Sequence, residues 1–471
     1  MLALFGLIGL LFVPGPSVVV PQGPAARPFV WDADDVFAGL QRRHAEATVA
    51  GCGAAFVRDL RAVQQQLDAL EAASPSPDDS RWDRLESAMF ELFASGGGCP
   101  DRIDTLVDVR GRVRTIAKTA SRGWPRIQTA RDRVYRLLYG SRAALEELLL
   151  QHRGDAPTLE RGTVVTSAAP SLVIEGVRIH SGDILLSRGG APTSAFIARG
   201  NDYPGNFSHV ALVHVDEHGE GSVIEAHIER GVAITDAAGY LGDKKLRIAV
   251  LRLRADHPAV LADPLLAHHA AEAALAEART RHIPYDFAMD IVDHRTQFCS
   301  EVAAAAYEAR GVELWDQLST FSSGGLARWM AYLGVRQLET QAPADLEYDS
   351  QLEVVAEWHD PQTLLDDHID NATIDAMLEQ AESGAELDHD GRMLPLARIA
   401  KLYSSIRVLF GGEGPIPEGM SATVALRAQW LAARHGTIRE RVREHVARAQ
   451  AEHGRTPPYW ELVALARAAA H

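Results

Sequence analysis

Apolar side chains recur with helical spacing over the first third of the chain. They repeat at an interval close to 3.6 residues over 54–73 and again over 131–150. Residues 78–80, of sequence Asp-Asp-Ser, precede another run of this kind and are side chains that cap helix N-termini. The pattern predicts an antiparallel helical bundle over residues 27–155.

The pattern changes in the middle of the chain and changes back near residue 341. Over 160–340, short runs of β-branched residues alternate with glycine-rich turns, as is typical of strands. The strand-like runs are 184–186, 210–215, 222–228 and 247–253. Helical runs follow at 265–279, 299–310, 364–380, 394–409, 422–435 and 438–453. We therefore expect an α+β domain over 160–340, between the N-terminal bundle and an all-α region over 341–471.

Composition and charge narrow the classes of partner. The chain has 471 residues, of which 46% are hydrophobic and 23% are charged, which is ordinary for a globular protein. Its 47 Lys and Arg residues against 63 Asp and Glu residues give a formal net charge of −16, which disfavours nucleic acid as the partner. No Cys/His cluster has zinc spacing, and no glycine-rich phosphate loop joins a strand to a helix. We expect no metal, no cofactor and no nucleic acid.

An unbroken apolar run covers residues 2–13. It is shorter than the roughly 20 residues that span a bilayer, and it fits the core of a secretory signal with small residues at 23–26 as a cleavage zone. We interpret residues 1–26 as a signal-like segment and expect an exported protein, periplasmic or in the cell envelope, with membrane contact only through this segment. An uncleaved tail on a cytoplasmic protein is the alternative. Export would also allow a Cys52–Cys99 disulfide.

Cys299 opens an Ala-rich helical run. A thiol in the first turn of a helix lies at the positive end of the helix dipole, beside backbone N–H groups without helical partners. Both features favour the nucleophilic thiolate, and the N–H groups can receive the oxyanion formed when an acyl carbonyl is attacked. The position therefore suits acyl-transfer chemistry, although a buried structural cysteine would show the same pattern.

His209 and Glu225 lie on two strands that a short polar loop connects. If this hairpin is centred near His218, His209 is opposite His227 and Glu225 is its diagonal neighbour, within reach of a long side chain. A carboxylate there can orient the imidazole and stabilise its charged form. His227 is a competing orienting group or second base. The non-catalytic alternatives are that His209 is a structural residue and that His227 faces solvent.

The order His, acidic residue, Cys resembles the permuted papain-like amidases, the YiiX-like branch of the NlpC/P60 superfamily. The resemblance covers about residues 181–315 and rests on the segments Ser181–Leu185, Phe207–Val213, Val223–Ala226, Pro284–Phe287 and Phe298–Glu301. It implies a permuted papain-like domain with an antiparallel sheet and a nucleophile helix. It also implies Cys299 as the nucleophile, His209 as the general base and acid, and Glu225 as the orienting residue.

Five further residues are candidates for binding substrate or the oxyanion. The resemblance implies that Tyr285 lies near the nucleophile and that Asp183 braces the site. Ser208 is expected to fix the start of the strand that His209 opens. The polar loop 201–206, which contains Tyr203, is expected to line the cleft, and His227 is the fifth candidate.

The leading hypothesis is a cysteine hydrolase that cleaves an amide or peptide bond through an acyl-enzyme. The resemblance and the signal-like segment together point to cell-wall peptides, derived from peptidoglycan, as the substrate. A lipid acyltransferase or thioesterase of the same fold is an alternative, for which the helical run over 321–333 would supply an amphipathic surface. The other alternative is a helical scaffold or binding protein that carries a papain-like module.

Overall fold

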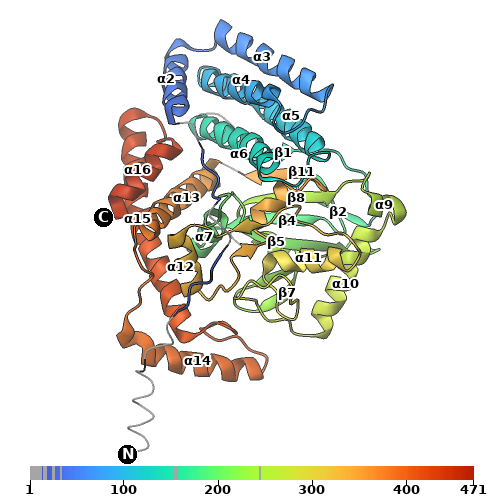
Figure 1. Ribbon diagram of the computed structural model, residues 1–471, viewed down its shortest axis with the longest axis vertical. Helices are drawn as coiled ribbons and strands as arrows, with labels where there is room; N and C mark the ends of the chain where they lie inside the picture. The colour runs from blue at the N-terminus through green and yellow to red at the C-terminus, as the bar shows by residue number, and fades with distance from the viewer. Residues whose placement is uncertain are drawn as a thin grey trace, which may run out of the picture.

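The computed structural model describes residue 13 and residues 18–23, 27–31, 34–152, 158–242, 245–359 and 361–470. Apart from residue 13, the apolar run over 2–13 lies outside these residues. Among the described residues, no helix combines the length and the apolar composition needed to cross a membrane. Figure 1 shows a sheet at the centre, one group of helices above it and a second group along one side.

The N-terminal helices pack as the sequence pattern predicts. They are α2 (Asp34–Ala50), α3 (Ala54–Glu71), α4 (Ser80–Gly96), α5 (Ile103–Ser121) and α6 (Gln128–Gln151), with a short 3₁₀ turn η1 at Pro100–Arg102. The Asp79 side chain caps α4 by accepting a hydrogen bond from the Arg81 backbone N–H at 2.9 Å. Apolar residues at helical spacing meet in one core, and a disulfide joins Cys52 to Cys99.

The central domain is built on a seven-stranded antiparallel sheet with the order β1-β11-β8-β4-β5-β6-β7. Its strands are β1 (Leu159–Arg161), β4 (Ile184–Gly189), β5 (His209–Val215), β6 (Gly221–His227), β7 (Gly231–Asp236), β8 (Lys245–Leu253) and β11 (Leu352–His359). Two small two-stranded sheets accompany it, formed by β2 (Ser171–Ile174) with β3 (Val177–His180) and by β9 (Ser319–Thr320) with β10 (Glu339–Thr340).

Different elements pack on the two faces of the large sheet. Even-numbered residues of β4 and β5 pack against α10 (Leu266–Thr280) and α11 (Cys299–Glu308). Odd-numbered residues of the same strands face the β2–β3 hairpin and α8 (Ala237–Gly242). This alternation is the ordinary consequence of successive side chains pointing to opposite faces of a strand. A short helix α9 (Pro258–Ala262) precedes α10.

The sheet extends further along the chain than the sequence pattern indicated. β11 lies beyond residue 340, where the pattern suggested that helix resumes, and it pairs with β8 on one side and with β1 on the other. Its sequence, LEVVAEWH, contains only two β-branched residues and three charged or polar ones. Its strand conformation therefore depends on partners that lie about one hundred or more residues earlier in the chain.

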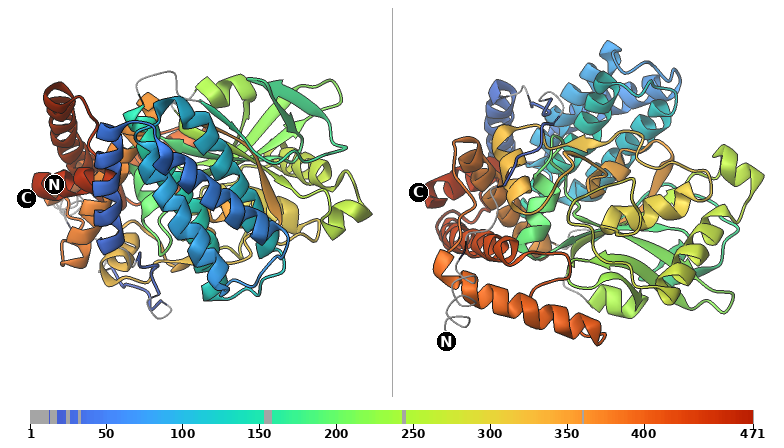
Figure 2. Two further views of the ribbon diagram at one scale, coloured as in Figure 1. Left: turned by 90° about the horizontal axis from the view of Figure 1, so that it is seen from above. Right: turned by 60° about the horizontal axis from the view of Figure 1, so that its bottom comes forward.

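Helices from the C-terminal part form a third core beside the sheet, together with two helices of the central region. Its members are α7 (Pro192–Arg199), α12 (Gly324–Tyr332), α13 (Pro361–Glu382), α15 (Ala422–His453) and α16 (Tyr459–Ala470). The 3₁₀ turns η2 (Pro343–Glu347) and η3 (Gly391–Met393) and the helix α14 (Leu394–Leu409) complete the fold. Figure 2 shows α14 running across the lower side of the molecule.

A cluster of buried ion pairs connects these parts. Arg142 of α6 binds Glu347 of η2 through two contacts of 2.6 Å and binds Glu357 of β11 at 2.9 Å. Arg247 of β8 binds Glu146 of α6 and Asp367 of α13, each at 2.6 Å. We call these six residues the buried ionic cluster. They join the N-terminal helices, the sheet and the C-terminal helices at one point.

Candidate active site

Cys299 is the first residue of α11, which packs against β5. Its sulfur lies 4.0 Å from the backbone carbonyl oxygen of Ser208, the residue before β5, so the nucleophile helix begins where that strand begins. The backbone N–H groups of Cys299 and Ser300 belong to the first helical turn, where no preceding helical carbonyl is available to them. The thiol is thus buried beside donors that could stabilise an oxyanion.

The hairpin formed by β5 and β6 has the register that the sequence predicted. Ala211 is paired with Glu225, which places His227 opposite His209 and Glu225 on the diagonal. The Nε2 atom of His209 lies 2.7 Å from a Glu225 carboxylate oxygen. The other imidazole nitrogen is therefore the one left for Cys299, whose thiol is the neighbour that raises the pKa of His209 most.

The charge on His209 follows from these neighbours. Burial alone lowers the pKa of an imidazole, but the hydrogen bonds to Cys299 and Glu225 outweigh it and raise the pKa of His209 to about 9. The imidazolium is thus the favoured form at neutral pH. A positive imidazole beside the sulfur is the arrangement that stabilises a thiolate.

Glu225 has three partners for a carboxylate that is only 1% exposed. One oxygen binds His209, and the other lies 3.2 Å from Nε2 of His227 and 3.5 Å from the Thr235 hydroxyl. Burial favours the neutral carboxyl, yet the hydrogen bonds from the two histidines hold the pKa of Glu225 well below its usual value. Glu225 is therefore an anion that bridges two imidazoles.

Thr235 is a site residue that the sequence analysis did not identify. It lies on β7, opposite Val223, and so is a diagonal neighbour of Glu225. β7 itself was not predicted, although Gly231 at its start and the alternation of Val232 and Ile234 with smaller side chains carry a weak strand signal.

Tyr285 and Ser208 lie near the nucleophile. Tyr285 forms a bridge with Gln297, two residues before Cys299. Burial and the charge of Cys299 raise the pKa of Tyr285 well above its ordinary value, so the phenol stays neutral beside the sulfur. The Ser208 hydroxyl bonds to that of Ser194, and its N–H donates to the Ser187 carbonyl at 3.0 Å, which anchors the start of β5.

Asp183 and Tyr203 do not lie at the site. The Asp183 carboxylate binds Arg252 through two contacts of 2.7 Å, at the end of β4 away from His209. It therefore braces the sheet rather than the catalytic residues. Tyr203 donates to Asp132 at 2.6 Å and is buried against α6, so its loop contacts the N-terminal bundle instead of lining a cleft. The expectations for these two residues were wrong because both found partners in distant segments.

The Glu301 side chain stabilises the start of α11. Its carboxyl accepts a hydrogen bond from the Phe298 backbone N–H at 2.9 Å, and its other oxygen lies 3.2 Å from Nδ1 of His294. Burial raises the pKa of Glu301 to about 9, so the carboxyl is neutral at pH 7. The contribution of Glu301 to this helix terminus therefore comes from the hydrogen bond and not from charge.

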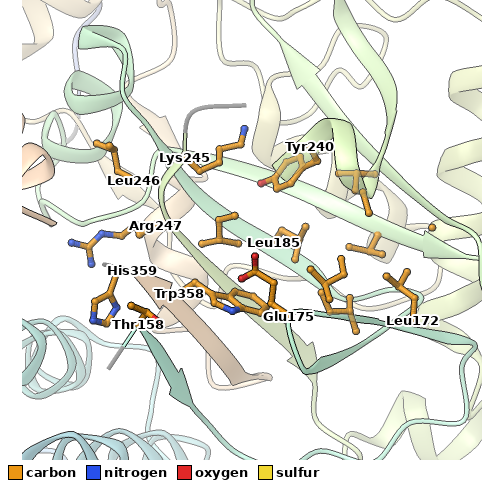
Figure 3. Close-up of a pocket in the computed structure, with 17 residues that line it drawn as sticks. Thr158, Leu172, Glu175, Leu185, Tyr240, Lys245, Leu246, Arg247, Trp358 and His359 are labelled. Carbon is orange, nitrogen blue, oxygen red and sulfur yellow. The ribbon is translucent and has the colours of Figure 1, made fainter. Parts of the chain in front are cut away.

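A cavity of about 300 Å³ lies on the face of the sheet that carries His209 and Glu225. Its walls include Val213 and Val223, which pair with each other and lie closer to the hairpin loop than His209 and Glu225 do. Neither Cys299 nor His209 lines the cavity. In the view of Figure 3, the Glu175 carboxylate lies between Tyr240 and Trp358. The lining is largely apolar, and the volume is at the small end of ligand pockets.

Within the described part of the chain, no group of three or more His, Cys, Asp or Glu residues has the geometry to hold a metal ion. The helix α12, which only the lipid alternative would use as an amphipathic surface, has Phe321, Trp329 and Met330 around it buried in the third core. It therefore offers no such surface.

Comparison with known proteins identifies the central region. Residues 178–356 match the family described as permuted papain-like amidase enzyme, YaeF/YiiX, C92 family. No curated protein and no solved structure matches the chain. The matched segment contains His209, Glu225 and Cys299 in that order. The central region of this chain therefore matches the permuted papain-like amidase family, as the resemblance predicted.

Proposed function

We propose that this protein is a cysteine hydrolase that cleaves an amide bond with Cys299, His209 and Glu225. The observation that carries the proposal is the 2.7 Å contact of Glu225 with one nitrogen of His209, whose ring also hydrogen bonds to Cys299 at the start of α11. A nucleophile, a base and a group that orients the base are thus connected in sequence.

The reaction would proceed in two steps. The Cys299 thiolate attacks the substrate carbonyl carbon, and the carbonyl electrons move to the oxygen. His209 then donates its proton to the leaving amine as the C–N bond breaks, leaving an acyl-thioester on Cys299. In the second step His209 removes a proton from water, which attacks the thioester, and the carboxylic acid and free thiol are released.

The backbone supplies the expected stabilisation of the oxyanion. The N–H groups of Cys299 and Ser300 in the first turn of α11 are directed away from the helix body, and the helix dipole adds to their effect. Removal of one such donor in other enzymes lowers kcat by about 10²–10³. Tyr285, neutral and close to the sulfur, is a further candidate donor to the substrate.

The substrate class follows from the family and from the signal-like segment. We propose peptide amides of the cell wall, met by an exported enzyme. A lipid acyltransferase or thioesterase of the same fold is the second candidate. A scaffold in which the helical parts bind a partner is the third candidate.

The first experiment measures the reactivity of the thiol. Purified protein is treated with limiting iodoacetamide across pH, and the label is located by intact mass and peptide mapping. We expect rapid labelling of Cys299 below pH 7, slowed at least about tenfold in His209→Ala, because a thiolate needs the adjacent imidazolium. His218→Ala, in the exposed hairpin loop, is the matched control.

Two results would contradict the proposal. Slow labelling of Cys299 with a midpoint near the free-thiol value of about 8.5 would show that no activated pair exists. Equal labelling in His209→Ala and wild type would show that His209 does not act on the sulfur. Turnover of amide, thioester and lipid substrates then distinguishes the amide hydrolase from the lipid acyltransferase or thioesterase. The scaffold is tested with Cys299→Ala, since an enzyme loses turnover in this variant whereas a scaffold keeps its binding partner.

A further inference from the structure

The helix α14 exposes a face of large apolar side chains. Leu402 is 64% exposed, Leu409 is 82% exposed and Phe410, which follows the helix, is 86% exposed. Leu396, Ile399 and Ile406 are about half exposed or more. An exposed apolar surface of this kind on one element marks an interaction site more often than scattered single residues do.

The exposed face lies opposite the face that packs on the protein. With about 100° between successive residues, the exposed apolar side chains span an arc of about 140°. Leu394, Ala397 and Ser404 are buried on the other side of the helix, which packs on α15. The apolar face therefore lies on the side of α14 turned away from α15.

The charges of α14 are of one sign. The helix contains Arg398, Lys401 and Arg407 and no acidic residue, in a chain whose formal net charge is −16. Arg398 and Arg407 fall at the two edges of the apolar arc on the helical projection. Cations along the edges of an apolar face are typical of helices that lie in the interfacial plane of a membrane.

A second apolar segment ends at the same place. The backbone carbonyl of Val13, the last residue of the apolar run over 2–13, accepts a hydrogen bond from Nη2 of Arg398 at 2.5 Å. The described end of the apolar run, Val13, thus lies against α14.

We propose that α14 lies in the plane of an anionic lipid surface, with the side chains of Leu402, Leu409 and Phe410 in the acyl region and Arg398 and Arg407 at the headgroups. This inference is independent of the amide chemistry proposed above. It departs from the expectation that membrane contact occurs only through residues 1–26.

The loop that follows α14 connects this surface to the active site. Glu413 binds Arg230, in the turn after β6, at 2.9 Å, and Glu418 binds His282 at 2.7 Å. Gly419 lies against the Phe287 ring and the Tyr285 carbonyl. A lipid-bound α14 would therefore hold the segment that carries Tyr285 next to the bilayer.

Flotation with lipid vesicles tests the proposal on the full chain. We expect wild type to float with phosphatidylcholine vesicles that contain 30% phosphatidylglycerol, more weakly with phosphatidylcholine alone, and less at 0.5 M NaCl. The variant Leu402→Gln/Leu409→Gln/Phe410→Gln should lose about tenfold or more of its vesicle partition. The control Val164→Gln/Val173→Gln/Leu261→Gln changes three exposed apolar residues elsewhere and should float as wild type does.

Several outcomes would overturn the inference. A wild type that does not float would reject lipid binding altogether. Flotation of the α14 variant at the wild-type level, with loss of flotation in Leu7→Gln/Leu10→Gln, would assign binding to the N-terminal run. A dimer that dissociates in the α14 variant would assign the face to a second copy. Labelling of Cys299 in the α14 variant at the wild-type rate shows that the loss of flotation is not a loss of folding.

Discussion

At the scale of single residues, the two carboxylate oxygens of Glu225 bind different partners. One oxygen holds His209, which contacts the sulfur, and the other is shared by His227 and Thr235, which do not. A buried carboxylate needs several donors to remain charged. The second pair of donors therefore keeps Glu225 ionised, and that charge in turn keeps the His209 imidazolium in place.

Replacement of Glu225 by Gln should move the pH profile of the enzyme. The variant removes the negative charge beside His209, so the pKa of His209 falls from about 9 and the imidazolium is lost at lower pH. We expect the alkaline limb of amide turnover, where His209 must carry the proton that it gives to the leaving amine, to shift down by about one pH unit or more. Glu217→Gln, in the exposed hairpin loop, should leave the limb unchanged. An unshifted limb in Glu225→Gln would show that the carboxylate does not act on His209.

Replacement of His227 should have a much smaller effect than replacement of His209. His227 binds the oxygen of Glu225 that does not bind His209, and without His227 the carboxylate keeps Thr235 and His209 as partners. We expect His227→Ala to lower the Cys299 labelling rate less than about tenfold, since general-base residues contribute about 10²–10⁴ and positioning residues less. Equal losses in His227→Ala and His209→Ala would instead make His227 the base.

At the scale of elements, the register of one hairpin brings the histidines and the carboxylate together. The polar loop over 216–221 fixed the pairing of β5 with β6, so the sequence sufficed to place Glu225 diagonal to His209. The sequence also sufficed to predict the helix that begins at Cys299. Asp183 and Tyr203 were placed wrongly because Arg252 and Asp132, their partners, belong to segments 69 and 71 residues away. Local pattern cannot reveal such contacts.

The cap of α11 gives a prediction that separates hydrogen bonding from charge. Glu301→Gln keeps an acceptor for the Phe298 N–H and removes a carboxyl whose pKa is raised to about 9. A raised pKa means that the folded state binds a proton that the unfolded state releases above about 4.5, so the stability of wild type falls from there up to about pH 9. Glu301→Gln should therefore gain stability relative to wild type as pH rises.

The comparison variant for this cap is Glu301→Ala, which removes the acceptor as well. We expect it to lower the free energy of unfolding by about 1–2 kcal/mol at pH 5, where Glu301→Gln is close to wild type. Urea unfolding at pH 5, 7 and 9 measures both variants. A difference between Glu301→Gln and wild type that does not grow with pH would mean that the carboxyl is charged.

At the scale of the whole molecule, the buried ionic cluster connects the N-terminal helices, the sheet and the C-terminal helices. Arg142 and Arg247 extend from a helix and a strand to carboxylates on η2, β11, α6 and α13. Opposite charges within the cluster hold the pKa of Glu357 well below its usual value despite burial. Because each charge is buried, removal of one leaves its partners without compensation.

Arg142→Ala should therefore destabilise the protein by about 3–5 kcal/mol, as expected for a broken buried pair. Arg112→Ala, which removes an exposed arginine that binds Asp68 and Glu71, should lower the free energy of unfolding by less than about 1 kcal/mol. Urea unfolding monitored by circular dichroism compares the two. Similar losses in both variants would show that the cluster does not connect the parts.

The position of β11 in the sheet also sets the order in which a growing chain can finish folding. His209, Glu225 and Cys299 have all been synthesised by residue 310, but β11 consists of Leu352–His359 and lies between β8 and β1. Until the ribosome has passed that strand, β8 has an open edge, and an open edge invites pairing with other chains. These three residues are therefore made well before the domain that holds them can close, and a chain that stops between the two would carry the Cys299 thiol in a sheet prone to aggregate.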